Sequence, residues 1–220
     1  MAKAALPLLS LFAAAPALAQ PQPQPKDSVA FTIDGQAYEF ALPEDFCLPD
    51  ARQQAVARSI AALDPQNDTM VHVYHCAPDN EDYIIVKVQK QRQRLPWDNA
   101  TFLEMAEQHF SSEFGRAMLE DEAEEAGSAV NRGAEGQMKI SGSTMGYAGR
   151  DAVCAYLRGV TTVEDAGGAV TVRSSSCMTL KGGYLLAVHA YGLAEEGTEF
   201  DLLARRSLAA AEGIEVRAAE

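Results

Sequence analysis

The sequence has few cations, a single tryptophan and, beyond its first nineteen residues, no long apolar run. It holds 18 Lys and Arg against 31 Asp and Glu, which gives a formal net charge of −13. Nucleic acid and anionic membrane surfaces repel a protein this acidic, so we expect no nucleic-acid partner. Because no later segment approaches the roughly 18 apolar residues of a membrane-spanning helix, we also expect no transmembrane anchor.

The short motifs of common enzymes are missing as well. The chain has no Gly-rich phosphate loop, His-Glu-x-x-His, Ser-x-x-Lys, Gly-x-Ser-x-Gly or Cys-x-x-Cys. The acidic run from Glu120 to Glu125 lacks the glycine turn of a calcium loop, and a solvated helix face explains it better. His72 and His75 should point to opposite sides of a strand, which disfavours a shared metal ion. We therefore predict no catalytic residue, metal or cofactor.

The first nineteen residues have the pattern of a signal peptide. Lys3 is followed by an apolar core, and the small residues Ala17 and Ala19 precede a cleavage point at Ala19-Gln20. A lipoprotein would need Cys in place of Gln20, so we expect no lipid anchor. We expect a signal peptide over residues 1–19, a disordered Pro/Gln-rich leader over 20–27 and a single α+β domain over 28–220. The mature protein should be periplasmic or secreted.

The four cysteines all follow the expected cleavage point. They are Cys47, Cys76, Cys154 and Cys177. An even number in an exported chain predicts two disulfides, and four cysteines allow three connectivities. We favour Cys47–Cys76 and Cys154–Cys177, because a turn at 165–168 would fold Cys154 back to nearly face Cys177.

Hydrophobic periodicity predicts an antiparallel sheet with helices packed on it. Asp34-Gly35 between alternating apolar residues predicts a hairpin of Val29–Ile33 and Gln36–Ala41. Further strands are expected at Met70–His75, Tyr83–Gln89, Met138–Met145, Ala152–Val163, Ala169–Leu180 and Tyr184–Tyr191. Helices are expected from Asp50 to about Leu63, Ala100 to about Phe114 and on to about Ala126, and Thr198 to Glu212. Gly127–Gly136 is expected to be a loop and Gly146–Gly149 a turn. The fold class is therefore α+β, an α/β/α sandwich.

This order of elements resembles the PsbP-like fold of extrinsic photosystem subunits and DcrB-type periplasmic lipoproteins. The residues that carry the resemblance are Phe31-Thr32-Ile33, Phe40-Ala41-Leu42-Pro43, Gly149-Arg150-Asp151-Ala152, Gly183-Tyr184-Leu185-Leu186 and the closing amphipathic helix. The chain departs from the lipoprotein members because it lacks a lipidation cysteine. The resemblance implies an accessory or binding role without catalysis, and it supplies no catalytic residues.

One basic segment stands out in this acidic chain and predicts a binding surface. Lys90, Arg92 and Arg94 alternate beyond an apolar strand, and Trp97, the only tryptophan, follows them. Arginine beside an exposed aromatic ring is typical of sites for carboxylates, phosphates or proteins. The alternative is a solvated strand end with Trp97 packed beneath it.

Together these patterns predict an exported binding or accessory protein without catalytic activity. Its partner would be an unknown protein or a small anionic ligand. Two alternatives remain open at this point. One is a small secreted hydrolase whose site has no sequence signature, and the other is a structural, envelope-associated interaction protein.

Overall fold

The computed structural model describes residues 28–77, 79–133, 139–165, 167–194 and 199–218. The expected signal peptide and the Pro/Gln-rich leader lie outside these ranges. The strands are β1 (Ser28–Ile33), β2 (Gln36–Ala41), β3 (Phe46–Cys47), β4 (Asn67–His75), β5 (Tyr83–Gln89), β6 (Lys139–Arg150), β7 (Ala155–Asp165), β8 (Gly168–Lys181), β9 (Tyr184–Leu193) and β10 (Ile214–Val216). The helices are α1 (Ala51–Ala62), α2 (Asn99–Ser111), α3 (Glu113–Gly133) and α4 (Phe200–Glu212).

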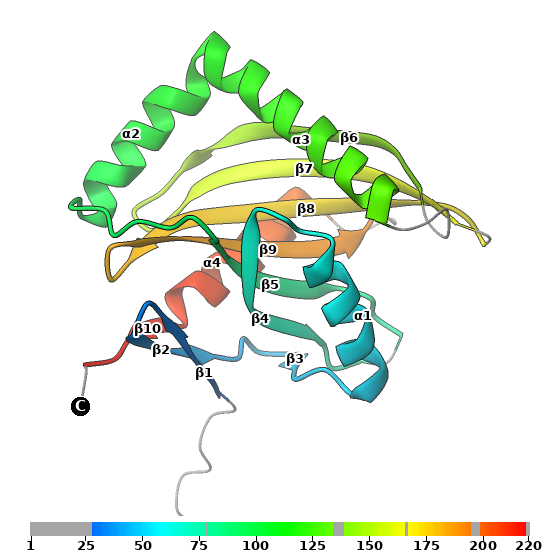
Figure 1. Cartoon of the computed structure of the whole chain (residues 1–220), viewed down its shortest axis with the longest axis horizontal. Coiled ribbons are helices and arrows are strands. Elements are labelled where there is room, and N and C mark those ends of the chain that lie inside the picture. Colours follow the sequence, from blue (N-terminus) through cyan, green and yellow to red (C-terminus); the bar gives the residue numbers. More distant parts are fainter. Residues whose placement is uncertain (1–27, 78, 134–138, 166, 195–198, 219–220) are drawn as a thin grey trace, which may run out of the picture.

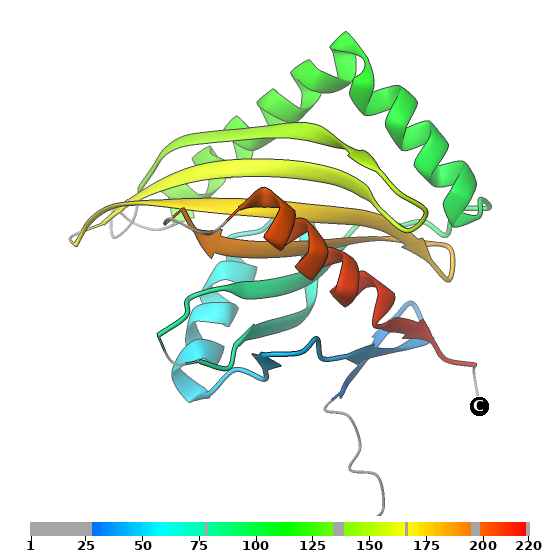
Figure 2. The ribbon, with the colours of Figure 1, turned by 180° about the vertical axis from the view of Figure 1, so that it is seen from behind.

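A seven-stranded antiparallel sheet forms the centre of the molecule. Its strand order is β3-β4-β5-β9-β8-β7-β6, and a smaller sheet has the order β1-β2-β10. Helices α1, α2 and α3 lie on one face of the large sheet, whereas α4 crosses the other face (Figures 1 and 2). This arrangement confirms the expected α+β class, with helices on both sides of an antiparallel sheet.

The β1–β2 hairpin forms where the sequence predicts it. Asp34 and Gly35 both have positive φ, 47° and 83°, as a tight two-residue hairpin turn requires. Phe31 pairs with Tyr38 across the strands, and their stacked rings lie 5.1 Å apart. The hairpin therefore presents one apolar face, which joins the main core.

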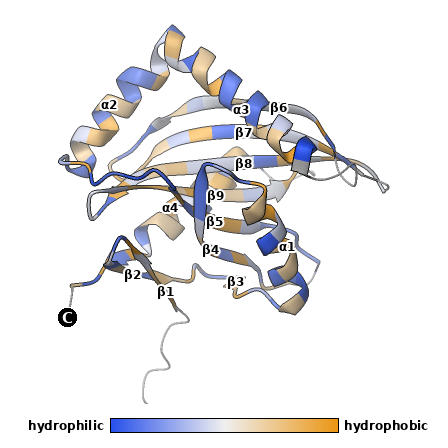
Figure 3. Ribbon diagram, viewed as in Figure 1, coloured by the Kyte–Doolittle hydropathy of each residue, from blue (hydrophilic) through white to orange (hydrophobic). Residues whose placement is uncertain are grey.

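The main core lies between the large sheet, α4 and the small sheet. Alternate residues of β9, from Tyr184 to Ala190, are buried on this side, while the residues between them are only half-buried on the other. Leu203 and Ala210 of α4 are fully buried against the core, and Figure 3 shows apolar residues concentrated on the central strands. The two faces of the sheet are therefore unequally covered.

Both expected disulfides are present. Cys47 is bonded to Cys76, at a sequence separation of 29, and Cys154 is bonded to Cys177, at a sequence separation of 23. The second bond is fully buried in the main core, whereas the first joins β3 to the end of β4 at the exposed edge of the sheet. Two such bonds are typical of proteins of an extracellular or periplasmic compartment. None of the described helices has both the length and the apolar character needed to cross a bilayer.

Helix α3 corrects the sequence prediction, because it continues through Gly133 where residues 127–136 were expected to form a loop. A Cβ atom at Gly127 would lie 3.0 Å from the side chain of Ile140, so the glycine allows the helix to pack closely on β6. Asn131 then exchanges two hydrogen bonds with the backbone of Ile140. Residues 134–138 lie outside the described ranges.

Strand β6 is also longer than predicted. Its residues 146–149 were expected to form a turn, but the strand continues to Arg150 with an irregular register between Tyr147 and Arg150. The turn comes later, where the carboxylate of Asp151 accepts hydrogen bonds from the amides of Val153 and Cys154. The glycines here mark a bulged strand end, which is a common alternative to a turn.

Candidate functional site

The predicted basic segment follows β5 and is held down by ion pairs and backbone contacts. Lys90 donates from Nζ to the carbonyl of Asp64 at 2.8 Å. Arg92 binds two carboxylates, Asp68 at 2.6 Å and Asp34 of the β1–β2 turn at 3.1 Å. Asp68 and Asp34 together raise the pKa of Arg92, so its charge is already balanced within the protein.

The other two members of the segment lie farther along. The side chain of Arg94 packs at Gly183 of the β8–β9 turn, and the neighbouring Leu95 amide donates to the Gly183 carbonyl at 2.7 Å. Trp97 is 39% exposed. The four residues are thus spread along the segment that joins β5 to α2, and their predicted role in binding stays a prediction.

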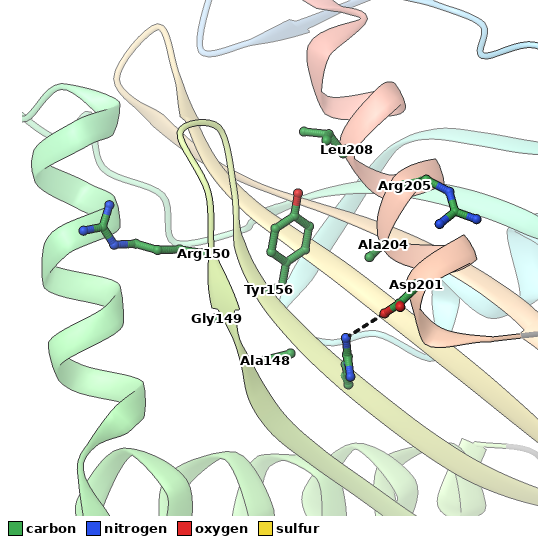
Figure 4. Close-up of a pocket in the computed structure, with 9 residues that line it drawn as sticks. Ala148, Gly149, Arg150, Tyr156, Asp201, Ala204, Arg205 and Leu208 are labelled. Atoms are coloured by element: carbon green, nitrogen blue, oxygen red, sulfur yellow. Dashed lines mark hydrogen bonds and ion pairs between the residues drawn. The ribbon is translucent and has the colours of Figure 1, made fainter.

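A groove between α4 and the strand pair β6–β7 gathers arginines that the sequence analysis did not single out. Its cavity volume is about 410 Å³. Figure 4 shows it on the α4 side of the sheet. The residues that line this α4 groove are Ala148, Gly149, Arg150, Tyr156, Arg158, Asp201, Ala204, Arg205 and Leu208. Small residues thus form much of its walls, and three arginines and one aspartate supply the charge.

Arg158 is the charged centre of the groove. Its guanidinium pairs with the carboxylate of Asp201 at 3.1 Å, drawn as the dashed line in Figure 4. It also lies over the ring of Phe200, 5.3 Å from the centroid, and Arg173 approaches the same ring at 5.9 Å. Because Arg158 is 43% exposed and Asp201 72% exposed, water screens this pair strongly. The pair is therefore open to exchange with an incoming anion.

Of the other two arginines, one is held by an ion pair and the other is not. Arg150 is directed toward α2, where it pairs with Glu107 at 2.6 Å, and this contact raises its pKa. Arg205 is exposed and has no hydrogen-bond or ion-pair partner among the residues that the structure describes. Its guanidinium points away from Tyr156 in Figure 4, and an unpaired, exposed side chain of this length can turn toward a ligand.

Tyr156 lines the groove, and a hydrogen bond to Asp151 holds its hydroxyl group in place. Its hydroxyl donates to Asp151 at 2.5 Å. Burial, the hydrogen bond and the charge of Asp151 all raise the pKa of Tyr156, so the phenol stays neutral. The Tyr156 ring is thus a rigid apolar surface beside the Arg158–Asp201 pair.

A second cluster of titratable groups lies on the opposite face, and it includes a serine–histidine hydrogen bond. Ser176 Oγ and His189 Nδ1 lie 2.6 Å apart on paired positions of β8 and β9. Burial, with a smaller effect of Lys87, lowers the pKa of His189 to about 3. A general base works best with a pKa near the operating pH, and Ser176 is only 4% exposed. We therefore assign this pair a structural role in joining the two strands.

Within the described ranges, no group of three or more His, Cys, Asp or Glu side chains is placed to hold a metal ion. The α4 groove has no signature in the sequence, because Arg150, Arg158 and Arg205 come from three different elements. No spacing rule connects them, and only the packing of α4 on the sheet brings them together.

The fold and groove define an antiparallel α+β protein with an arginine-lined surface groove. No family model matches the chain, and no curated protein matches it. Among solved structures, the chain is similar to the crystal structure of LpqN, involved in cell envelope biogenesis of Mycobacterium tuberculosis. The identity is 12%, the TM-score is 0.35, and the match covers 87% of this chain and 91% of LpqN. A likeness at this level assigns neither family nor function.

Proposed function

We propose that the protein is an exported binding protein of a bacterial periplasm that holds an anionic ligand in the α4 groove and does not transform it. The observation that carries the proposal is the presence of three arginines in one shallow groove of a protein whose net charge is −13. Arginine presents a planar set of donors that fits carboxylate and phosphate groups. The expected ligand is therefore a small carboxylate or phosphate compound.

Two further features support this proposal. The buried disulfide and the edge disulfide fit the oxidising compartment that the expected signal peptide also indicates. The groove is open and shallow, and the tyrosine hydroxyl that lines it is already bonded to Asp151. Such a surface suits reversible binding. The PsbP-like resemblance of the sequence, which implies an accessory or binding role, remains part of the proposal.

Isothermal titration calorimetry tests the proposal with defined probes. Succinate and glycerol 3-phosphate represent the two anion classes, and putrescine is the cationic control. We expect at least one anion to bind, and putrescine to give no heat of binding in this groove. A double variant in which alanine replaces both Arg158 and Arg205 should bind that anion about tenfold more weakly or worse, and tenfold corresponds to about 1.4 kcal/mol of binding free energy.

The matched control removes two arginines elsewhere. Arg52 and Arg58 are both exposed on α1, so their replacement by alanine changes the net charge equally without touching the groove. Equal weakening in both double variants would show that overall charge, and not the groove, attracts the anion. Such a result would contradict the proposal.

A further inference from the structure

A second cavity lies on the face of the sheet opposite the α4 groove. Its volume is about 240 Å³. Val163 lies on β7, like Arg158 of the groove, but an odd number of positions farther along the strand. Because successive side chains of a strand alternate between its two faces, Val163 and Arg158 point to opposite sides of the sheet. The lining residues are Glu81, Tyr83, Val163, Val170, Val172, Gly192 and Leu193.

The walls of this second cavity are apolar and come from neighbouring strands. Val172 of β8 is opposite Leu193 of β9, and Val170 is opposite Val163 of β7. Val170 remains 44% exposed. Exposed branched side chains that adjoin one another favour contact with an apolar ligand, because covering them removes apolar surface from water.

An aromatic ring closes one side of the cavity. The ring of Tyr83 stacks on that of Tyr191, with centroids 4.7 Å apart and 16° between the planes. Tyr83 therefore has a fixed orientation, held by its neighbour on β9. On its other side lie the rings of His72 and Tyr74, with centroids 5.3 Å and 5.9 Å away, so Tyr83 adds to the apolar wall of the cavity.

Glu81 is the one charged residue among those described as lining the cavity. It is exposed, and its carboxylate has no ion-pair or hydrogen-bond partner within the described part of the chain. Since the whole protein carries a net charge of −13, the surrounding field also favours cations. The cavity thus combines an apolar wall, which includes a fixed aromatic ring, and a free negative charge.

We propose that this cavity binds a small amphiphile with an apolar body and a single amine or ammonium group. The cation would lie against the Glu81 carboxylate, and the apolar body would lie against Val170 and Val172. The site does not depend on the α4 groove, which lies on the other face and selects the opposite charge.

Three probes of equal chain length separate charge recognition from simple apolar binding. Octylammonium, octanol and octanoate share the same body and differ only in the head group. In calorimetric titrations at concentrations below those at which the probes aggregate, octylammonium should bind most tightly, octanol less tightly and octanoate least tightly. For an exposed carboxylate, an advantage of about three- to fivefold over octanol is expected.

Substitutions then assign the effect to the cavity. Glu81→Gln should remove the advantage of octylammonium over octanol and leave octanol unchanged, whereas Val170→Ser should weaken both by a similar factor. Glu120→Gln on α3 is the matched control, because Glu120 is also exposed and unpaired among the described residues. Unchanged melting temperatures would show that the variants are folded.

Four results would overturn the proposal. The first is octanoate binding as tightly as octylammonium, and the second is an unchanged octylammonium advantage in Glu81→Gln. The third is no measurable binding of any probe to the wild-type protein. A loss of the advantage in Glu120→Gln equal to that in Glu81→Gln would also contradict it, because it would show an effect of total charge.

Discussion

The imidazole of His72 stacks on the ring of Tyr74, with centroids 4.7 Å apart and 11° between the planes. His72 is 9% exposed, and neither of its ring nitrogens has a hydrogen-bond partner among the described residues. Tyr83 approaches the same ring at 5.3 Å. A histidine enclosed by aromatic rings in this way is held in its neutral form, since a charge there would lack both water and a partner.

This enclosure predicts a loss of stability in mild acid. Burial, aided by the charge of Lys87, lowers the pKa of His72 from 6.5 to about 4. Below pH 6.5 the unfolded chain binds a proton that the folded chain rejects, so the free energy of unfolding falls between pH 6.5 and about 4. Above pH 6.5 His72 contributes no pH dependence. By about pH 4.5 the loss should reach about 2–3 kcal/mol.

Urea unfolding at about pH 7 and about pH 4.5 measures this loss. His72→Phe keeps an aromatic ring in the stack and removes the titrating group, so its stability should fall less on acidification than that of the wild type. His109→Gln, on the exposed side of α2, serves as the control and should behave as the wild type does. Parallel pH profiles for His72→Phe and the wild type would show that His72 is not responsible.

The two disulfides should contribute unequally to stability. Their loops of 29 and 23 residues predict about 3.5 kcal/mol each from chain entropy. However, Cys154 and Cys177 are fully buried, so replacing both with alanine also removes core contacts. We expect this double variant to lose about 1–2 kcal/mol more than the Cys47/Cys76 double variant.

Alkylation after mild reduction provides a second measure of the same difference. The exposed Cys47–Cys76 bond should be reduced and labelled first, and mass spectrometry of the peptides identifies the labelled residues. Equal losses of stability together with equal rates of labelling would contradict the distinction between the core bond and the edge bond.

Asn131 is expected to fix the C-terminal half of α3 on the sheet. Its side-chain amide donates to the Ile140 carbonyl at 3.0 Å and accepts from the Ile140 amide at 2.5 Å. Asn131→Ala removes both bonds and should cost about 1–2 kcal/mol. Hydrogen exchange should accelerate at Ile140 and along the end of α3, while β5 and β9 stay protected. Uniform acceleration across the sheet would indicate global destabilisation instead of a local role.

Local signals account for the parts of the fold that the sequence could predict. Asp34-Gly35 requires only its own backbone geometry, and Asp50 caps α1 through a reciprocal hydrogen-bond pair with Gln53. The cysteine pairing followed from a turn between two strands, and it is confirmed. Each of these features is decided within a few residues or by one hairpin.

Features that depend on distant partners could not be predicted in the same way. Gly127 reads as a loop residue until Ile140 is packed against it. Strand β10 pairs with β2 across most of the chain length. The α4 groove needs residues of β6, β7 and α4 to meet, and its arginines carry no common motif. In each case the deciding contact joins residues that lie far apart in the sequence.

The central claim, that the α4 groove binds anions, is tested most directly by NMR of the arginine Nε–H groups during separate titrations with succinate and with glycerol 3-phosphate. With at least one of the two anions, we expect the signals of Arg158 and Arg205 to shift with one saturable curve, while those of Arg92 and Arg94 stay unchanged. Shifts confined to Arg94 and the Trp97 indole would place binding on the segment after β5. That result, or an absence of any saturable shift, would contradict the account.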